Sequence, residues 1–249
     1  MIYIKNTPNN TGVAIYGDFL DYENLYESLH TVVGDEDEHI TYDSARLRVL
    51  GVCYDIRHAL MGDREIEFVD NSMDNEKKMR MSIITSDKNL YLKIYALWPE
   101  ILFVILALNS FLQLYAKKKS KKSRNFMLDK QNIWDESIAH IRIFQAAAAK
   151  CIKETISKAS FNQFMNLMSK DCKWSENYTR QYLDTLNCKF IGMNSEKRLK
   201  GIPKIAKRLV ERGKEYKQLK AYVSAAAKEY NTNEDNIKPL LDYPEDFEW

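Results

Sequence analysis

ILFVILALNSFLQLYA, residues 101–116, is a long apolar run, and its environment decides the fold. Its 16 residues fall short of the ~20 that an α-helix needs to cross a bilayer. Asn109, Ser110 and Gln113 interrupt the run, Pro99 precedes it and Lys117 follows it. We therefore predict a helix in the middle of a protein core, and not a membrane span.

Charge changes sign at the end of this run. Residues 1–116 contain ten Lys and Arg against eighteen Asp and Glu, whereas residues 117–249 contain 27 against 17. The last eighteen residues are acidic again. We therefore divide the chain into an acidic α+β domain (1–116), a basic connector (117–130), a basic helical domain (131–231) and an acidic tail (232–249). This split predicts either closure of the two halves on each other or an acidic partner.

The acidic part alternates between strand and helix patterns. Polar turn residues separate short β-type runs, and apolar residues recur at helical spacing before Gly34 and again before Gly62. The predicted strands are Ile2–Lys5, Val13–Gly17, Glu65–Asp70, Met79–Thr85 and Leu90–Ala96. One predicted helix begins after Asp18 and ends at Gly34, and a second helix spans Ser44–Met61. The last two strands are predicted to form a hairpin around a loop at residues 86–89.

The basic part shows only helical patterns after the connector. Predicted helices cover residues 134–157, 161–168, 175–186, 195–200, 203–212 and 215–230, with Gly201 and Pro203 separating two of them. The predicted fold class is therefore α+β, with an N-terminal antiparallel sheet of about five strands and an all-helical basic C-terminal bundle. In the tail, aromatic and acidic residues alternate as in docking peptides, or the tail folds back on the bundle.

Two basic clusters are candidates for binding an acidic partner, because phosphate binding by such clusters releases counterions. A flexible linker and a solvated helix face are the alternatives. Residues 198–209 also partly resemble the turn of a helix-hairpin-helix DNA-binding element, but Pro203 removes a donor N–H that this turn uses. The candidate residues are Lys117, Lys118, Lys119, Lys121, Lys122 and Arg124 in the connector, and Lys200, Lys204, Lys207, Arg208 and Lys214 further on.

Asp55 and His58 are the catalytic candidates. They stand three residues apart on a predicted helix, so the carboxylate could orient the imidazole for general-base work. A structural pair is the alternative, because no nucleophile is tied to them by any motif. The acidic loop 35–38 lacks the calcium-loop pattern, and phosphate-cradling glycine motifs are absent, so we predict no metal and no cofactor.

The cysteines and the N-terminus predict a cytoplasmic protein. Cys53, Cys151, Cys172 and Cys188 are far apart and form no zinc-binding pattern. The first residues do not have the basic segment and apolar core of a secretory signal. Free thiols in a reducing compartment are expected.

Several segments resemble a family of uncharacterised bacterial proteins. They are residues 4–12 (IKNTPNNTG), 45–59 (ARLRVLGVCYDIRHA), 68–71 (FVDN) and 98–103 (WPEILF). The resemblance implies a bacterial cytoplasmic protein, and it carries over no activity, substrate or catalytic residue.

The sequence therefore predicts a non-enzymatic accessory protein whose basic helical half engages an acidic protein subunit or nucleic acid. A role in a defence or mobile-element complex is a guess that no residue supports. The alternative is an enzyme acting on nucleic acid through an unrecognised site that includes Asp55 and His58. Opposite charges in the two halves also suit a homo-oligomer.

Overall fold

The computed structural model describes residues 1–120, 124–168, 179–244 and 246–249, and the chain is α+β. Its antiparallel sheet has the order β1-β2-β4-β3, from Tyr3–Asn6, Gly12–Gly17, Lys88–Leu97 and Glu65–Asp70. Ile4, Ile15 and Ile94 are neighbours across the three strands β1, β2 and β4. Because strand side chains alternate between faces, these buried residues mark the face that the helices cover.

The sheet has four strands in the described part of the chain, so the prediction of about five is wrong. Residues predicted as the strand Met79–Thr85 instead begin in the helix α3, Asn75–Met81. The Asp74 side chain caps α3 by accepting a hydrogen bond from the backbone N–H of Lys77. Residues 81–87 are all exposed and, unlike residues 88–90 of β4, they lie outside the ladder between β3 and β4.

Two N-terminal helices pack together beside the sheet. Helix α1, Phe19–Val33, begins with a capping box between Asp18 and Asp21 and ends at Gly34, whose φ of 73° suits glycine. A short 3₁₀ turn, η1 (Ile40–Tyr42), leads into α2, Asp43–Leu60. Both helices also contact the long helix α4, which follows β4 in the chain.

Helix α4, Trp98–Lys119, contains the apolar run and lies in the core, as predicted. It contacts α1, α2, β2 and β4 as well as three helices from the second half of the chain. By length and hydropathy α4 could cross a membrane, but 67% of its apolar window is buried within the protein. The helix runs on through Lys119, so the first three lysines of the predicted connector are helical.

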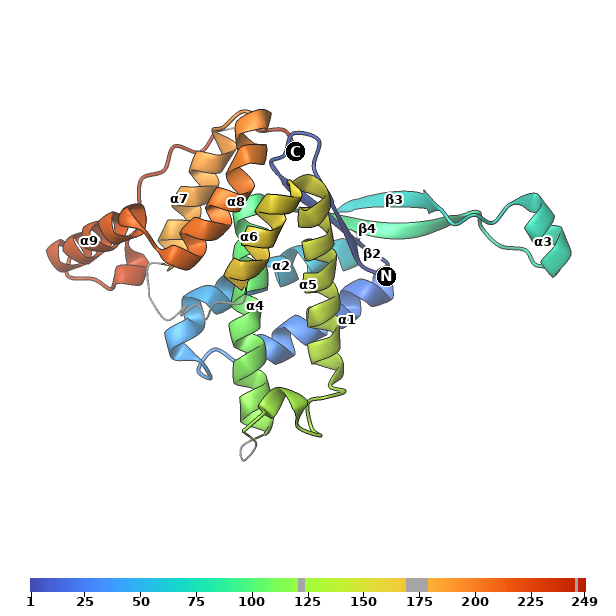
Figure 1. Ribbon diagram of the computed structural model, residues 1–249, viewed down its shortest axis with the longest axis horizontal. Helices are drawn as coiled ribbons and strands as arrows, with labels where there is room; N and C mark the ends of the chain where they lie inside the picture. The colour runs from blue at the N-terminus through green and yellow to red at the C-terminus, as the bar shows by residue number, and fades with distance from the viewer. Residues whose placement is uncertain (121–123, 169–178, 245) are drawn as a thin grey trace.

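The remaining elements are helical within the described residues. They are η2 (Phe126–Leu128), α5 (Glu136–Thr155), α6 (Lys158–Met168), α7 (Thr179–Ile191), α8 (Ser195–Glu211), α9 (Lys214–Glu229) and η3 (Glu234–Asn236). Helix α5 packs on α1 and β1, while α7 and α8 pack on α4 (Figure 1). One hydrophobic core therefore contains side chains from both sides of residue 116.

Helix α8 is continuous, so the predicted break at Gly201 and Pro203 is wrong. Gly201 is buried and helical, and a Cβ there would lie 3.4 Å from the Phe190 ring of α7. Its role is a close approach between two helices, and not a turn. The helix-hairpin-helix resemblance loses its structural basis, because the expected turn is absent from this described stretch.

The tail after η3 folds back along α7 toward the N-terminal hairpin. Tyr243 Oη donates to the carbonyl of Asp184 at 2.9 Å. The Thr11 hydroxyl donates to the carbonyl of Glu248 at 2.6 Å, and the Trp249 ring stacks on Tyr95 at 4.9 Å between centroids. The C-terminus accordingly lies beside the β1–β2 loop (Figure 1).

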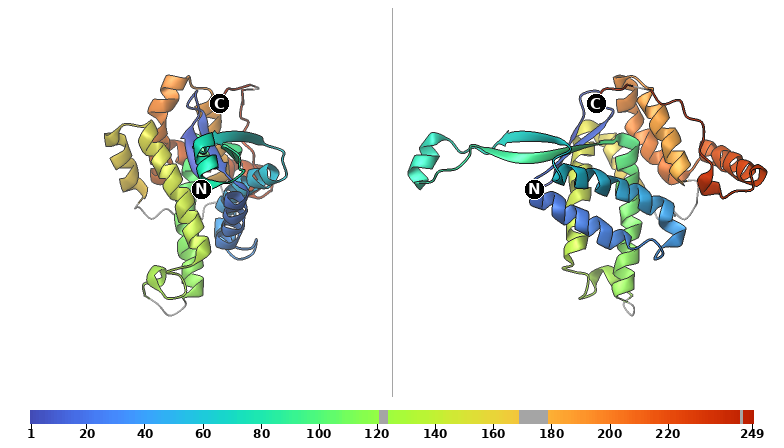
Figure 2. Two further views of the ribbon diagram at one scale, coloured as in Figure 1. Left: turned by 90° about the vertical axis from the view of Figure 1, so that its right-hand side faces the viewer. Right: turned by 180° about the vertical axis from the view of Figure 1, so that it is seen from behind.

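A long arm projects from the body. It comprises residues 65–92, which form β3, α3 and the first half of β4. The two strands leave the body side by side, and α3 caps the far end (Figures 1 and 2). The arm points away from α9, which lies at the opposite end of the molecule.

Candidate functional site

The predicted catalytic residues Asp55 and His58 lie on α2, and each has a partner of its own. Asp55 Oδ1 accepts a hydrogen bond from Arg64 Nη2 at 2.8 Å. His58 Nδ1 lies 3.2 Å from Asp63 Oδ2. The structure thus joins each side chain to the segment that follows α2, and does not bring the two together. Neither residue lines the cavity described below.

The predicted connector residues have separate surroundings. Lys118 pairs with Glu38 at 2.9 Å, and Lys119 pairs with Asp135 at 2.5 Å. Lys117 lines a cavity. Arg124 is exposed, while Lys121 and Lys122 lie outside the described residues.

The second basic cluster is partly neutralised by nearby carboxylates. Lys200 pairs with Glu196, Lys207 with Glu211 and Arg208 with Glu215, at 2.5, 3.7 and 3.7 Å. These pairs are largely exposed, so each contributes little to stability.

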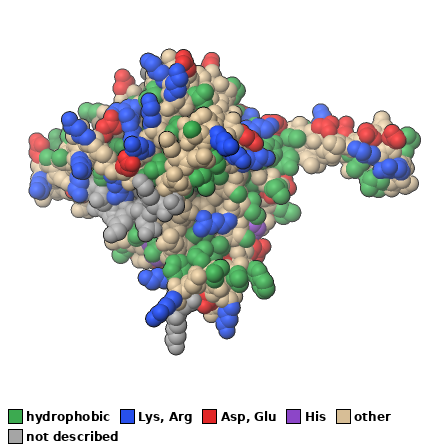
Figure 3. Space-filling view, in the orientation of Figure 1, with side chains coloured by type: hydrophobic (Ala, Val, Ile, Leu, Met, Phe, Trp, Pro, Cys, Tyr) green, Lys and Arg blue, Asp and Glu red, His purple; other side chains and the backbone are tan. Residues whose placement is uncertain are grey.

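Lys204 and Lys214 are exposed, and no ion pair to either is described. Figure 3 shows Lys and Arg side chains over α7, α8 and α9 interspersed with acidic ones. The positive charge is therefore present on this face but is not continuous.

A cavity of about 870 Å³ opens between α4, α5 and α6. Asn109, Gln113 and Lys117 follow one another at four-residue spacing, so they form a polar stripe along one face of the mostly apolar helix α4. Across from them, Ala146 and Ala149 of α5 are too small to fill the space. The described lining residues are Tyr42, Ile105, Leu106, Asn109, Ser110, Gln113, Leu114, Lys117, Phe126, Arg142, Gln145, Ala146, Ala149, Phe164, Met165 and Met168.

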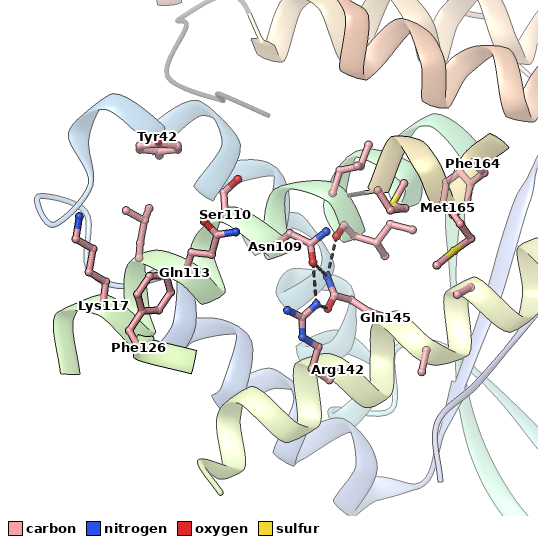
Figure 4. Close-up of a pocket in the computed structure, with 16 residues that line it drawn as sticks. Tyr42, Asn109, Ser110, Gln113, Lys117, Phe126, Arg142, Gln145, Phe164 and Met165 are labelled. Atoms are coloured by element: carbon pink, nitrogen blue, oxygen red, sulfur yellow. Dashed lines mark hydrogen bonds between the residues drawn. The ribbon is translucent and has the colours of Figure 1, made fainter. Parts of the chain in front are cut away.

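A hydrogen-bonded group of three side chains lies at the middle of this cavity (Figure 4). Arg142 Nη1 donates to Asn109 Oδ1 at 2.8 Å and to Gln145 Oε1 at 2.9 Å. Gln145 Nε2 donates in turn to Asn109 Oδ1 and to the Ile105 carbonyl, at 3.1 and 2.8 Å. The two amides therefore fix the position of the guanidinium without neutralising it.

Arg142 is a cation with no carboxylate partner among the described residues. Partial burial lowers its pKa from the ordinary value, because the charged form loses hydration. Arginine nevertheless stays protonated in proteins. Arg142 is thus an exposed cation on the cavity wall that no described carboxylate neutralises.

The two ends of the cavity differ in chemistry. Lys117 lies at one end with Tyr42 and Phe126, eight residues or about 12 Å along α4 from Asn109 (Figure 4). Phe164 and Met165 of α6 lie at the other end, which is apolar (Figure 4). A molecule that fills the cavity would therefore meet cations and amides toward one end and apolar side chains toward the other.

The described part of this lining is mostly apolar and carries a few polar side chains. Among the described residues that line the cavity there is no Asp, Glu, His or Cys, the side chains that most often act as general bases or nucleophiles. A concave, mostly apolar site with a few placed polar groups is typical of small-molecule binding.

The sequence contained one signal for this site. The signal is the four-residue spacing of Asn109 and Gln113 within the apolar run, which places both on one face of the helix. Polar side chains in a largely buried helix face other polar groups or solvent, so this face indicates a polar site. The sequence did not indicate that Arg142 belongs to this site, because 33 residues separate it from its partner Asn109.

Comparisons with known proteins point to a family and to no activity. Neither the curated proteins nor the solved structures gave a match. A family model described as "Domain of unknown function (DUF6904)" matches residues 2–249. This confirms the resemblance to an uncharacterised family, while bacterial origin stays a prediction. Because the match covers nearly the whole chain, the protein belongs to the DUF6904 family.

Proposed function

We propose that this chain is a binding protein that holds a small organic anion in the cavity between α4 and α5. The observation that carries the proposal is Arg142, a cation that lines the cavity and has no described carboxylate partner. A bound anion would pair with this cation, and hydrogen bonds between two ionised groups are stronger than those between neutral ones.

The guanidinium is oriented for such a ligand. Both of its hydrogen bonds to protein side chains start from Nη1, so Nη2 and Nε can still donate. Two parallel N–H donors match the two oxygens of a carboxylate or a phosphate. The ligand's head group is therefore a carboxylate or phosphate held at Arg142.

The rest of the ligand is apolar. Phe164, Met165 and Met168 line the far end of the cavity, and methionine adapts to irregular apolar shapes. The volume of about 870 Å³ is within the roughly 300–1,000 Å³ of small-molecule sites. A carbon chain or ring attached to one anionic group fits these features.

Calorimetric titration with octanoate, octyl phosphate, octanol and octylamine tests this proposal. The two anions are expected to bind more tightly than octanol, and octylamine least. Arg142→Gln should weaken binding of the preferred anion by tenfold or more, which is about 1.4 kcal/mol, and leave octanol binding unchanged.

Arg124→Gln is the matched control, since it removes the same charge from an exposed position outside the cavity. It should leave every affinity unchanged. The proposal fails if neither anion binds, or if Arg142→Gln and Arg124→Gln have the same effect.

The interaction function predicted from charge is a second proposal, in which the C-terminal helices present a basic face to an acidic protein or nucleic acid. Exposed Lys204 and Lys214, with no described ion pair, support it. Binding to duplex DNA, single-stranded DNA and RNA at two salt concentrations tests the nucleic-acid form. Affinity that falls steeply with salt supports it, and no binding at low salt contradicts it.

A further inference from the structure

The arm, residues 65–92, contributes no residue to the proposed ligand site. It exposes apolar side chains along its length. β3 and β4 are held together by their own antiparallel ladder, and every residue of α3 is at least partly exposed. At the tip, Met79 is 76% exposed and Ile84 is fully exposed. Figure 3 shows apolar side chains gathered at this tip beside charged ones.

The strands of the arm carry a second apolar group. Phe68 lies opposite Leu90 and Ile66 opposite Leu92, so these side chains share one face of the ladder. Leu92 is buried on the body, and the same face continues outward to Phe68, which is 64% exposed. The core-facing side of the sheet therefore extends past the core that covers it.

Pairing through the free edge of the sheet is disfavoured. β3 is an edge strand and carries Glu65, Glu67 and Asp70, of which the first two share the single cation Lys93. When β3 pairs antiparallel with β3 of another copy, these carboxylates approach one another, and like charges opposite each other are destabilising. An occupant therefore packs on the face of the arm, and not along its edge.

Charge indicates which occupant fits. The arm belongs to the acidic segment 1–116 and itself holds six Asp and Glu against four Lys and Arg. Residues 117–231 are basic, but the helices α7 to α9 lie at the other end of the molecule from the arm (Figure 1). The arm cannot reach the basic helices of its own chain, whereas a second copy brings the same helices within reach.

We infer that the arm docks on a second copy of this chain, with its apolar face packed and its acidic residues toward the basic helices of that copy. Two-fold symmetry doubles the contact, because each copy then offers one arm and accepts one. A stable interface of standard size buries about 800 Å² on each partner. Two arms that expose apolar side chains from β3 to the tip are suited to supply that area.

The mass of the full chain in solution, measured by light scattering over a range of concentrations, tests this inference. We expect a species of twice 29.2 kDa. The double variant Phe68→Ser, Ile84→Ser should weaken association at least tenfold. Both side chains are exposed, so the fold should persist, and circular dichroism and melting temperature check that it does.

Leu128→Ser with Trp134→Ser is the matched control, since both side chains are exposed but lie outside the arm. Its mass should equal that of the unchanged chain. Cross-linking from a photoreactive residue at Ser86, in mixed light and heavy copies, should join the arm to α8 or α9 of the other copy. A monomer at all concentrations, or a dimer that the arm variant leaves intact, overturns the inference.

Discussion

Among individual residues, the charged cluster around Glu100 joins three helices. Arg48 of α2 pairs with Asp184 of α7 and lies 3.7 Å from Glu100 of α4, and Asn187 donates to Glu100 at 2.9 Å. Burial raises the pKa of Glu100 above its ordinary value near 4.5, and Arg48 opposes this shift only in part. Folding therefore makes Glu100 easier to protonate than it is in the unfolded chain.

This shift predicts a pH dependence with a definite sign. A carboxyl group with a raised folded pKa costs stability as pH rises from its unfolded pKa to its folded one. The free energy of unfolding of Glu100→Gln minus that of the unchanged chain should therefore increase as pH rises from about 4.5. Urea unfolding at a series of pH values measures this difference.

Glu65→Gln provides a control of opposite sign. A hydrogen bond from Lys93 lowers the pKa of Glu65, so ionised Glu65 adds stability that is lost as pH falls through that lowered pKa. Its variant should lose stability relative to the unchanged chain as pH rises toward 4.5. A Glu100→Gln curve that follows the Glu65→Gln curve would show that Arg48 outweighs burial.

Residue spacing alone was a poor guide to the candidate site. Asp55 and His58 have the i, i+3 spacing of a pair, yet Arg64 and Asp63 lie just beyond the helix and compete for them. Charge partners across a turn cannot be ranked without coordinates. Arg142 was equally hidden, because its significance is the lack of a described carboxylate nearby, which only the three-dimensional arrangement reveals.

Among the elements, α8 is notable because it continues through Pro203. Proline has no N–H for the carbonyl four residues earlier and clashes with it, which costs about 3 kcal/mol in a helix interior. Burial of Ile202, Ile205 and Leu209 against neighbouring helices offsets this cost. The sequence signals for a helix break were therefore real, and tertiary packing outweighed them.

Replacing this proline should stabilise the protein. Pro203→Ala restores the hydrogen bond but increases the entropy of the unfolded chain, so we expect a net gain of about 2 kcal/mol in the free energy of unfolding. Pro99→Ala is the control, because Pro99 lies in the first turn of α4, where proline is tolerated. Denaturant titration that finds no gain for Pro203→Ala would contradict this account.

Element type was predictable where burial and local pattern agreed. The N-terminal hairpin and the central helix were both predicted, since their apolar residues face the core. β3 was predicted from its local pattern alone, since its apolar residues Ile66 and Phe68 are exposed. Residues 79–85 have the same apolar content but no core beneath them, and the cap at Asp74 favours a helix. At these exposed residues the local signal for a helix therefore outweighed the strand pattern.

At the scale of the whole molecule, the tail joins the end of the described chain to its beginning. Trp249 stacks on Tyr95 of β4, and a Cβ at Gly12 would lie 2.9 Å from its ring. Asn9 Nδ2 donates to the Trp249 carbonyl at 3.2 Å. The tail therefore covers the sheet next to the N-terminal loop.

Removing this contact should lower stability. Trp249→Ala is expected to reduce the free energy of unfolding by about 2 kcal/mol, from lost apolar contact and ring stacking. Trp134→Ala is the control, because that side chain is 92% exposed and should contribute less than about 0.5 kcal/mol. Thermal and urea unfolding that affect both variants equally would show that the tail contact is not stabilising.

The position of α4 has a consequence for how the molecule opens. Its neighbours include α1, α2, α5, α7, α8 and the strands β2 and β4, so no local fraying exposes its backbone. Amide hydrogens in the middle of α4 therefore exchange with solvent only when the entire chain unfolds, whereas those of α3 exchange through local opening. The slowest-exchanging helix amides thus report global stability, and the arm is free to rearrange without affecting it.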